Sequence, residues 1–221
     1  MPYLSRLVLD LSCEQAFADL ASAYSMHRTV MRAFPAPRDG NRVLYRLDRL
    51  PPAGAACLLV QSSQPADWSF LQSMPGYLMA PHEAGMPNPA QTFFAVELRR
   101  DEVLSFRLRA NPTFRRGRKR LGYRRRGDQL RWLTRQGARW GFEPLAVSVS
   151  QEGRLLTRKS FSPRSDALCF VSVLFTGLLR VVCAERLRDA VESGLGSGKA
   201  FGLASCHWLV GSERATLLAE A

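Results

Sequence analysis

The sequence has no hydrophobic run long enough to cross a bilayer. Among its 221 residues, no apolar stretch reaches the roughly 18 residues that a transmembrane helix needs. The first 20 residues carry acidic and polar side chains where a secretion signal requires an apolar segment. We therefore expect a cytoplasmic protein that does not use a membrane as a partner.

Closely spaced metal-binding residues are also absent from the sequence. Zinc ribbons and knuckles need paired thiolates, and no Cys-x-x-Cys pair occurs here. Acidic residues are few and dispersed, so nothing resembles the carboxylate cluster that holds two metal ions in many nucleases. We expect no metal and no other cofactor. The five cysteines are scattered, at Cys13, Cys57, Cys169, Cys183 and Cys206.

Negative charge is missing from one long segment. The chain has 31 basic and 19 acidic residues, a net charge of +12, yet Val103 to Gly127 contains ten basic residues and no acidic one. Such concentrated charge indicates a polyanionic partner. Because arginine dominates the segment and pairs with two phosphate oxygens at once, a nucleic acid is favoured over a bilayer surface. The alternative is a solvated, mobile loop.

The first half of the chain has the element order of a ferredoxin-like domain. Alternating apolar residues predict the first and last of four strands, and a turn-forming Pro-Pro-Ala-Gly at 51–54 links the two between them. A spacing of three and four predicts one long helix that begins at a capping box formed by Ser12 and Gln15. Strand, helix, two strands, a degenerate helix and a strand is the ferredoxin-like order. The predicted strands are 3–11, 42–47, 56–61 and 103–109, and the predicted helix is 13–34.

The second half repeats this element order without repeating the sequence. A helix over 128–140, capped by Asp128, precedes several predicted strands, a second helix and a last strand. We therefore predict an α+β protein with two tandem ferredoxin-like (RRM-like) domains, 1–111 and 128–221, joined by a basic linker or insertion at 112–127. The later predicted strands are 145–149, 155–161, 167–176 and 201–210, with an apolar run at 178–182 and the second helix at 184–194.

One helix carries a constellation suited to phosphate chemistry. Tyr24 and His27 are three residues apart and share a face of the predicted helix, with Arg28 and Arg32 on an adjoining stripe. An imidazole transfers protons near neutral pH, and guanidinium groups stabilise charge on phosphate oxygens. Without a metal, cleavage would require the 2′-hydroxyl of RNA as the nucleophile. The alternative is that Tyr24 and His27 are packing residues of an amphipathic helix.

A glycine-rich loop spans Gly194 to Gly202. It lacks the spacing of a P-loop and of a Rossmann fingerprint, and a helix precedes it. Such a loop still allows backbone N–H groups to approach phosphates closely. An ordinary flexible connection between helix and strand is the other interpretation.

Four segments, in this order, resemble the CasE family of CRISPR-associated endoribonucleases, the RNA-processing subunits of the type I-E Cascade complex. They are Tyr-Leu-Ser-Arg-Leu-Val-Leu at 3–9, Tyr-Ser-Met-His-Arg-Thr at 24–29, Phe-Arg-Leu-Arg-Ala-Asn-Pro at 106–112 and Gly-Leu-Gly-Ser-Gly-Lys-Ala-Phe-Gly-Leu at 194–203. The resemblance runs from about residue 3 to residue 210. It implies two ferredoxin-like domains and metal-independent cleavage of CRISPR precursor RNA at the base of each repeat hairpin. The products would be a 5′-hydroxyl and a 2′,3′-cyclic phosphate or 3′-phosphate, and Cascade would retain the crRNA.

The resemblance also implies roles for individual residues. His27 would be the catalytic proton-transfer residue, Tyr24 would assist at the scissile phosphate, and the glycine-rich loop would lie near the RNA. The arginine-rich segment 114–126 exceeds what the family leads us to expect, and it would grip the hairpin stem, a neighbouring Cascade subunit or nothing ordered. The expected RNA-binding residues are Arg28, Arg32, Arg115, Arg116, Arg118, Lys119, Arg120, Arg158, Lys159, Arg164, Gly196, Gly198 and Lys199.

Two other functions remain open at the level of the sequence. The first is a non-catalytic module of the same fold that binds an RNA stem-loop and leaves it whole. The second is a basic assembly protein whose arginine-rich stretch contacts a protein or ribosomal partner. No RNP1-type aromatic signature of an RNA recognition motif is present to favour the first.

Overall fold

The computed structural model describes residues 2–34, 42–50, 54–93, 97–117, 119–158, 167–196 and 206–209. The chain divides into two compact units after Ala95. We call them the N-terminal unit and the C-terminal unit and describe each by itself. Within the described residues, no helix is both long and apolar enough to cross a membrane.

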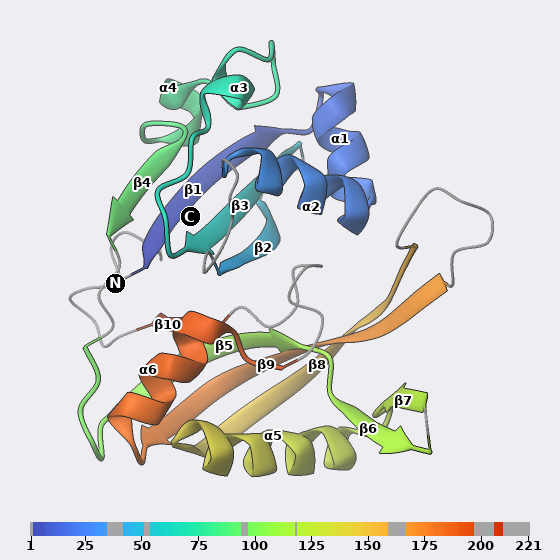
Figure 1. Cartoon of the computed structure of the whole chain (residues 1–221), viewed down its shortest axis with the longest axis vertical. Helices are drawn as coiled ribbons and strands as arrows, with labels where there is room; N and C mark the ends of the chain where they lie inside the picture. Colours follow the sequence, from blue (N-terminus) through green and yellow to red (C-terminus); the bar gives the residue numbers. More distant parts are fainter. Residues whose placement is uncertain are drawn as a thin grey trace. The chain divides into compact units, whose positions relative to one another are not determined.

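The N-terminal unit is a four-stranded antiparallel sheet with two helices on one face (Figure 1). The strands lie in the order β2-β3-β1-β4, with every neighbouring pair antiparallel. This is the ferredoxin-like arrangement predicted from the element order. The bounds are β1 Tyr3–Asp10, α1 Glu14–Ala21, α2 Ala23–Arg32, β2 Val43–Leu50, β3 Ala55–Ser62, α3 Ser69–Gln72, α4 Pro81–Ala84 and β4 Ala90–Phe93.

The predicted long helix 13–34 is two helices that meet at Ser22. The backbone of Ser22 is extended, with φ of −126°, and its side chain accepts a hydrogen bond from the N–H of Ser25 at the start of α2. The predicted capping box at Ser12 is wrong, because the N-cap of α1 is Cys13 and makes no side-chain cap bond. The Ser12 hydroxyl donates instead to the carboxylate of Asp10. A serine in mid-helix competes with the backbone for hydrogen bonds, which explains the break at Ser22.

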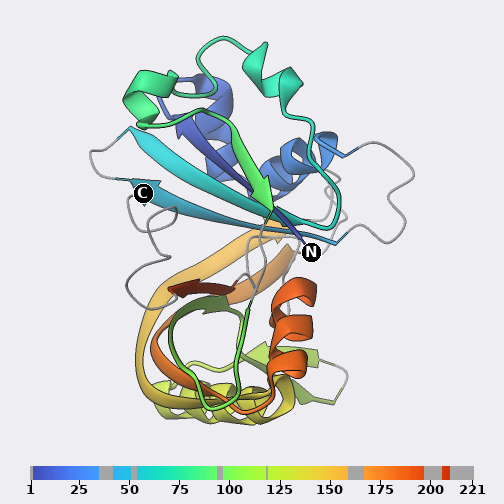
Figure 2. The same cartoon turned by 90° about the vertical axis from the view of Figure 1, so that its left-hand side faces the viewer.

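The C-terminal unit repeats the same fold. Its strands lie in the order β10-β5-β9-β8, again antiparallel throughout, so the prediction of two ferredoxin-like units is confirmed (Figures 1 and 2). The bounds are β5 Val103–Ala110, β6 Thr113–Arg116, β7 Lys119–Gly122, α5 Arg126–Trp140, β8 Phe142–Arg158, β9 Ala167–Val181, α6 Ala184–Ser193 and β10 Cys206–Leu209.

One predicted strand belongs to the other unit. The stretch 103–109 was expected to complete the first sheet, and this is wrong: β5 pairs with β9 and β10, while β4 is the fourth strand of the first sheet. Three of the four residues of β4 are exposed, so it lacks the alternating pattern that marks a half-buried strand. The units therefore divide earlier in the chain than the predicted boundary at 111.

The predicted short strands of the second half are two long ones. Segment 145–149 and the described part of 155–161, which ends at residue 158, join in β8. Segments 167–176 and 178–181 join in β9, which passes through Gly177 without a break. A methyl group added at Gly177 would collide with the backbone carbonyl of Ala146 on β8. This close approach occurs beside the irregularity between Pro144 and Ala146, so the glycine permits the two long strands to pair there.

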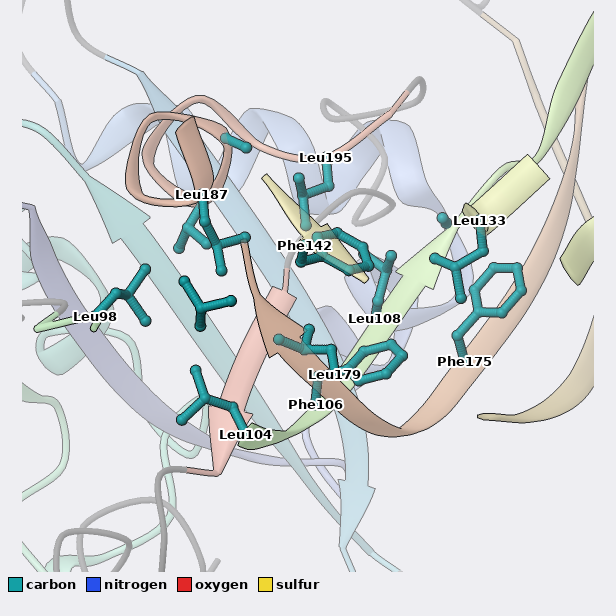
Figure 3. Close-up of a cluster of buried hydrophobic side chains, with 14 of the residues drawn as sticks. Leu98, Leu104, Phe106, Leu108, Leu133, Phe142, Phe175, Leu179, Leu187 and Leu195 are labelled. Carbon is teal, nitrogen blue, oxygen red and sulfur yellow. The ribbon is translucent and has the colours of Figure 1, made fainter. Parts of the chain in front are cut away.

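A single hydrophobic core holds α5 and α6 against the second sheet. Figure 3 shows Phe106, Phe142 and Phe175 from three strands gathered with Leu133 of α5 and Leu187 of α6. All five side chains are at most 2% exposed. The core therefore fixes the faces that both helices turn outward.

The predicted basic linker is a β-hairpin inserted between β5 and α5. Strands β6 and β7 form their own two-stranded sheet, which joins no other strand of the described residues. At its base, a methyl group added to Gly122 would collide with the side chain of Val171 on β9. The last residue of the hairpin is thus packed against the main sheet, although a two-stranded ribbon is only marginally stable by itself.

Candidate active site and basic cavity

Helix α2 presents Tyr24 and His27 on a partly exposed face. Met26 and Val30 of the same helix are fully buried in the N-terminal core and anchor it to the sheet. Tyr24 and His27 are each half-buried, one helical turn apart. Both side chains therefore lie at the border between the buried and the exposed parts of the helix.

Tyr45 of β2 lies beside His27, a contact that the sequence gave no signal for. The two rings are nearly parallel, at 26°, with their centroids 6.5 Å apart. The Tyr45 hydroxyl donates to the backbone carbonyl of Ala23, at 3.2 Å, in the first turn of α2. Burial raises the pKa of the Tyr45 phenol, which keeps it protonated and able to donate. Tyr45 thus joins the helix that carries His27 to the sheet beneath it.

A buried carboxylate connects α2 to α1 and to the loop after α3. Asp19 is 2% exposed and accepts hydrogen bonds from the hydroxyls of Thr29, at 2.7 Å, and Tyr77, at 2.8 Å, and from the amide of Gln15, at 3.1 Å. Thr29 follows His27 by two residues on the same helix. Burial and the Asp19 charge raise the pKa of Tyr77, so its hydroxyl stays a donor to the carboxylate.

Two arginines lie on the exposed part of α2. Arg28 and Arg32 are both exposed, and the guanidinium of Arg32 lies over the ring of Phe70, 4.4 Å from its centroid. Arg28 follows His27 directly, whereas Arg32 comes five residues later and points about 140° away from the imidazole around the helix axis. The helix therefore carries a proton-transfer group, a phenol and two cations, of which Arg28 is the nearer to His27 in the sequence, and groups of these kinds can support phosphodiester cleavage.

In the C-terminal unit, several predicted RNA-binding residues line one cavity of about 660 Å³. Residues of the β6–β7 hairpin, of α5, of α6 and of the start of the glycine-rich loop line it. Among its lining residues are Arg115, Arg120, Trp132, Arg139, Trp140 and Arg186, together with Gly196. Sequence reasoning missed Arg139, Trp140 and Arg186, because nothing in their local sequence indicates that two helices and a hairpin converge.

The other predicted RNA-binding residues do not join this cavity. Arg116 and Lys119 are exposed and oppose each other across the hairpin. Arg158 ends β8. The remaining predicted residues lie outside the described part of the chain; they are Arg118, Lys159, Arg164, Gly198 and Lys199.

No metal-ligand cluster occurs in the part of the chain that the structure describes. Nowhere among those residues do three or more histidine, cysteine, aspartate or glutamate side chains gather so as to hold an ion. Cys13, Cys57 and Cys183 are free thiols. Burial is the largest influence on Cys57 and raises the pKa of its thiol.

The fold and the site define a protein of the tandem ferredoxin-like class with a basic surface in each unit. A family model described as "CRISPR associated protein" matches residues 2–203. The chain belongs to this family, and its resemblance to CasE is confirmed by the relatives below.

One curated relative is the CRISPR-associated endoribonuclease Cse3 of Thermus thermophilus. It is 34% identical over 213 residues, which cover 91% of this chain and 96% of the relative. A solved structure of Thermus thermophilus Cse3, bound to an RNA that represents a pre-cleavage complex, matches with a TM-score of 0.80 at 32% identity, covering 94% of this chain and 98% of the other. The Cas6e protein of Escherichia coli matches with a TM-score of 0.63 at 22% identity, covering 94% and 98%, and supports the fold alone.

Proposed function

We propose that this protein is a metal-independent endoribonuclease that cleaves CRISPR precursor RNA at the base of the repeat stem-loop. The ribose 2′-hydroxyl attacks the adjacent phosphorus while the bond to the 5′-oxygen of the next nucleotide breaks. The products are a 2′,3′-cyclic phosphate, or the 3′-phosphate formed from it by water, and a 5′-hydroxyl. The protein then keeps the mature crRNA and joins it to the other Cascade subunits.

The observation that carries this proposal is that Tyr24 and His27 stay partly exposed on a helix that Met26 and Val30 anchor in the core. A relative that is 34% identical over nearly the whole chain and is named an endoribonuclease supports the same activity. The Cse3 structure with a pre-cleavage RNA supports RNA as the substrate.

Each residue of α2 has a distinct role in the proposed reaction. His27 protonates the departing 5′-oxygen or removes the proton of the 2′-hydroxyl. Tyr24 orients the phosphate through its hydroxyl. Arg28 and Arg32 offset the negative charge that grows on the phosphate oxygens. Tyr45 holds the imidazole in place from below, through the ring contact and the bond to Ala23.

Single-turnover cleavage of a CRISPR repeat hairpin in excess EDTA tests the proposal. We expect cutting at full rate without Mg²⁺, and we expect His27→Ala to slow it by roughly 10²- to 10⁴-fold, the usual contribution of a proton-transfer residue. Tyr24→Phe should slow cleavage less. A 2′-deoxy substitution at the cleavage site should block cutting and leave hairpin binding intact.

The matched control is Arg42→Ala, which removes an exposed cation of the same unit outside α2. Its cleavage rate should stay close to that of the wild type. A need for added Mg²⁺, or wild-type cutting by His27→Ala, would defeat the mechanism. Binding of the hairpin without any cutting would favour the non-catalytic RNA-binding module.

A further inference from the structure

The side chains that line the cavity of the C-terminal unit carry a net positive charge. Four arginines line it, Arg115, Arg120, Arg139 and Arg186, against the single carboxylate of Asp189. Arg115 and Arg120 are directly opposite each other in the β6–β7 hairpin. Like charges in that position destabilise a strand pair, and an anion between them lessens the penalty. The excess of exposed cations therefore favours binding of a negatively charged group.

Aromatic side chains form part of the wall beside these cations. Trp132 is 5% exposed and stacks on Phe175 of the core, while Trp140 is half-buried and meets Trp132 edge to face, with their centroids 5.8 Å apart. Trp132 is fixed by its packing, and Trp140 is left partly open to the cavity. Base-to-aromatic stacking beside a positively charged surface is how proteins hold single-stranded nucleic acid.

The size of the cavity suits a single nucleotide. At about 660 Å³ it lies within the range of small-molecule sites. A nucleotide turned out of its strand fits such a space and brings its phosphate and its base to the lining together. An unpaired nucleotide is thus the ligand that matches the charge of the cavity, its aromatic lining and its volume.

We propose that this cavity binds an unpaired nucleotide of the RNA, separately from the cleavage chemistry assigned to His27. The phosphate lies among the four arginines and the base packs against Trp140. The inference rests on the proposed function only in taking RNA as the partner.

Asp189 and Gln136 give the cavity a preference among bases. Both line it, and they belong to α6 and α5 respectively. A carboxylate accepts hydrogen bonds well from two adjacent N–H donors, and guanine is the base that presents such a pair on its Watson–Crick edge. We therefore expect guanosine to be favoured over uridine.

Binding of short RNAs to the full-length chain tests the inference without any cleavage. The probes are a fluorescein-labelled uridine octamer, the same octamer with one central guanosine, and a blunt RNA duplex, measured by fluorescence anisotropy in the His27→Ala background. The test variant is Arg139→Ala/Arg186→Ala. The matched control is Arg131→Ala/Arg188→Ala, which removes one arginine from each of the same two helices at positions that do not line the cavity.

We expect the test variant to bind the guanosine octamer roughly tenfold or more weakly, since it loses two charge-assisted phosphate contacts, and the control to change by less than about threefold. The salt dependence of octamer binding should also fall in the test variant alone. Asp189→Ala should abolish the preference for the guanosine octamer without weakening binding of the uridine octamer, because it removes a negative charge from a phosphate site.

Equal weakening in the two double variants, or equal loss for octamer and duplex, would overturn the proposal. Normal octamer binding by the test variant, combined with failure to assemble with the other Cascade subunits, would overturn it in favour of a protein-docking site. Failure of the wild type to cut RNA would refute the proposed function and leave the octamer result standing. Intact hairpin cleavage, combined with octamer binding that does not depend on the cavity arginines, would refute the cavity proposal and leave the proposed function standing.

Discussion

Replacing Asp19 with alanine tests whether the buried carboxylate fixes the catalytic helix. The side chain accepts bonds from Thr29 on α2, from Tyr77 in the loop after α3 and from Gln15 on its own helix. The Asp19→Ala change removes the charged acceptor of the Tyr77 hydroxyl, and Tyr77 is 0% exposed, so water cannot replace the carboxylate; only the neighbouring Thr29 hydroxyl remains. Thr29 and Gln15 are only partly buried or exposed and recover some bonding to water.

The magnitude follows from these differences in burial. A hydrogen bond to a charged group contributes about 1.5–3 kcal/mol. Two such bonds, one from a fully buried donor and one from a half-buried donor, set the expected loss for Asp19→Ala at about 3–4 kcal/mol. Asp19→Asn keeps an oxygen that can accept from Thr29 and Tyr77 and should lose only about 1 kcal/mol. The free energy of unfolding of a typical domain is about 5–15 kcal/mol. A loss of this size therefore makes the alanine variant unfold much more readily.

Chemical denaturation with a double-mutant cycle measures this effect. Thr29→Val alone should destabilise the wild type by about 1–2 kcal/mol and should cost clearly less in the Asp19→Ala background, where the bond to the carboxylate is already lost and only the contact with Tyr77 remains. Single-turnover cleavage should fall in Asp19→Ala under conditions where the variant remains folded. An equal cost of Thr29→Val in both backgrounds would refute the network. So would a loss below about 1 kcal/mol for Asp19→Ala.

Two further predictions concern the C-terminal unit. Gly177→Ala should destabilise it by about 3 kcal/mol or more, because the new methyl group meets the backbone carbonyl of Ala146; a thermal melt unchanged within a degree would contradict this close approach. Burial raises the pKa of Glu152, but the hydrogen bonds and charge of Arg109 outweigh it, so the pKa is lowered overall from 4.5. The pair therefore stabilises the fold above pH 4.5 and loses its effect as the pH falls further, so Glu152→Gln should be about 1 kcal/mol less stable at pH 7 and approach the wild type in acid. A constant difference across the pH range in denaturant titrations would refute this assignment.

Local patterns in the sequence predicted most of the elements that the structure contains. Alternation marked β1, a turn-forming Pro-Pro-Ala-Gly marked the connection from β2 to β3, and three-residue spacing placed Tyr24 with His27, because each signal depends only on neighbours in the chain. The errors lie where tertiary contacts decide. The stretch 103–109 has the same alternation in either sheet, so the pattern cannot say which strands it pairs with.

The basic hairpin illustrates the same division between local and long-range information. Composition identified the arginine-rich segment as the source of the excess charge, and it could not indicate that the segment folds into β6 and β7. The glycine-rich loop was recognised by its composition. Arg139 and Arg186 line the same cavity as the start of that loop, but nothing in their local sequence indicates it. These residues come from separate helices and meet only through the packing of the core.

The sequence by itself determined the chemistry available to this protein: an imidazole and a phenol one helical turn apart, two neighbouring guanidinium groups and a dense block of arginine. These properties depend only on residue type and on short spacings in the sequence, so they can be recognised without a structure. Only the tertiary structure decided that Tyr45 lies against His27, that Asp19 joins three segments and that a hairpin and two helices enclose one cationic cavity. Each of these depends on residues far apart in the chain, which come together because burying the hydrophobic faces of helix and sheet leaves one arrangement of lowest free energy.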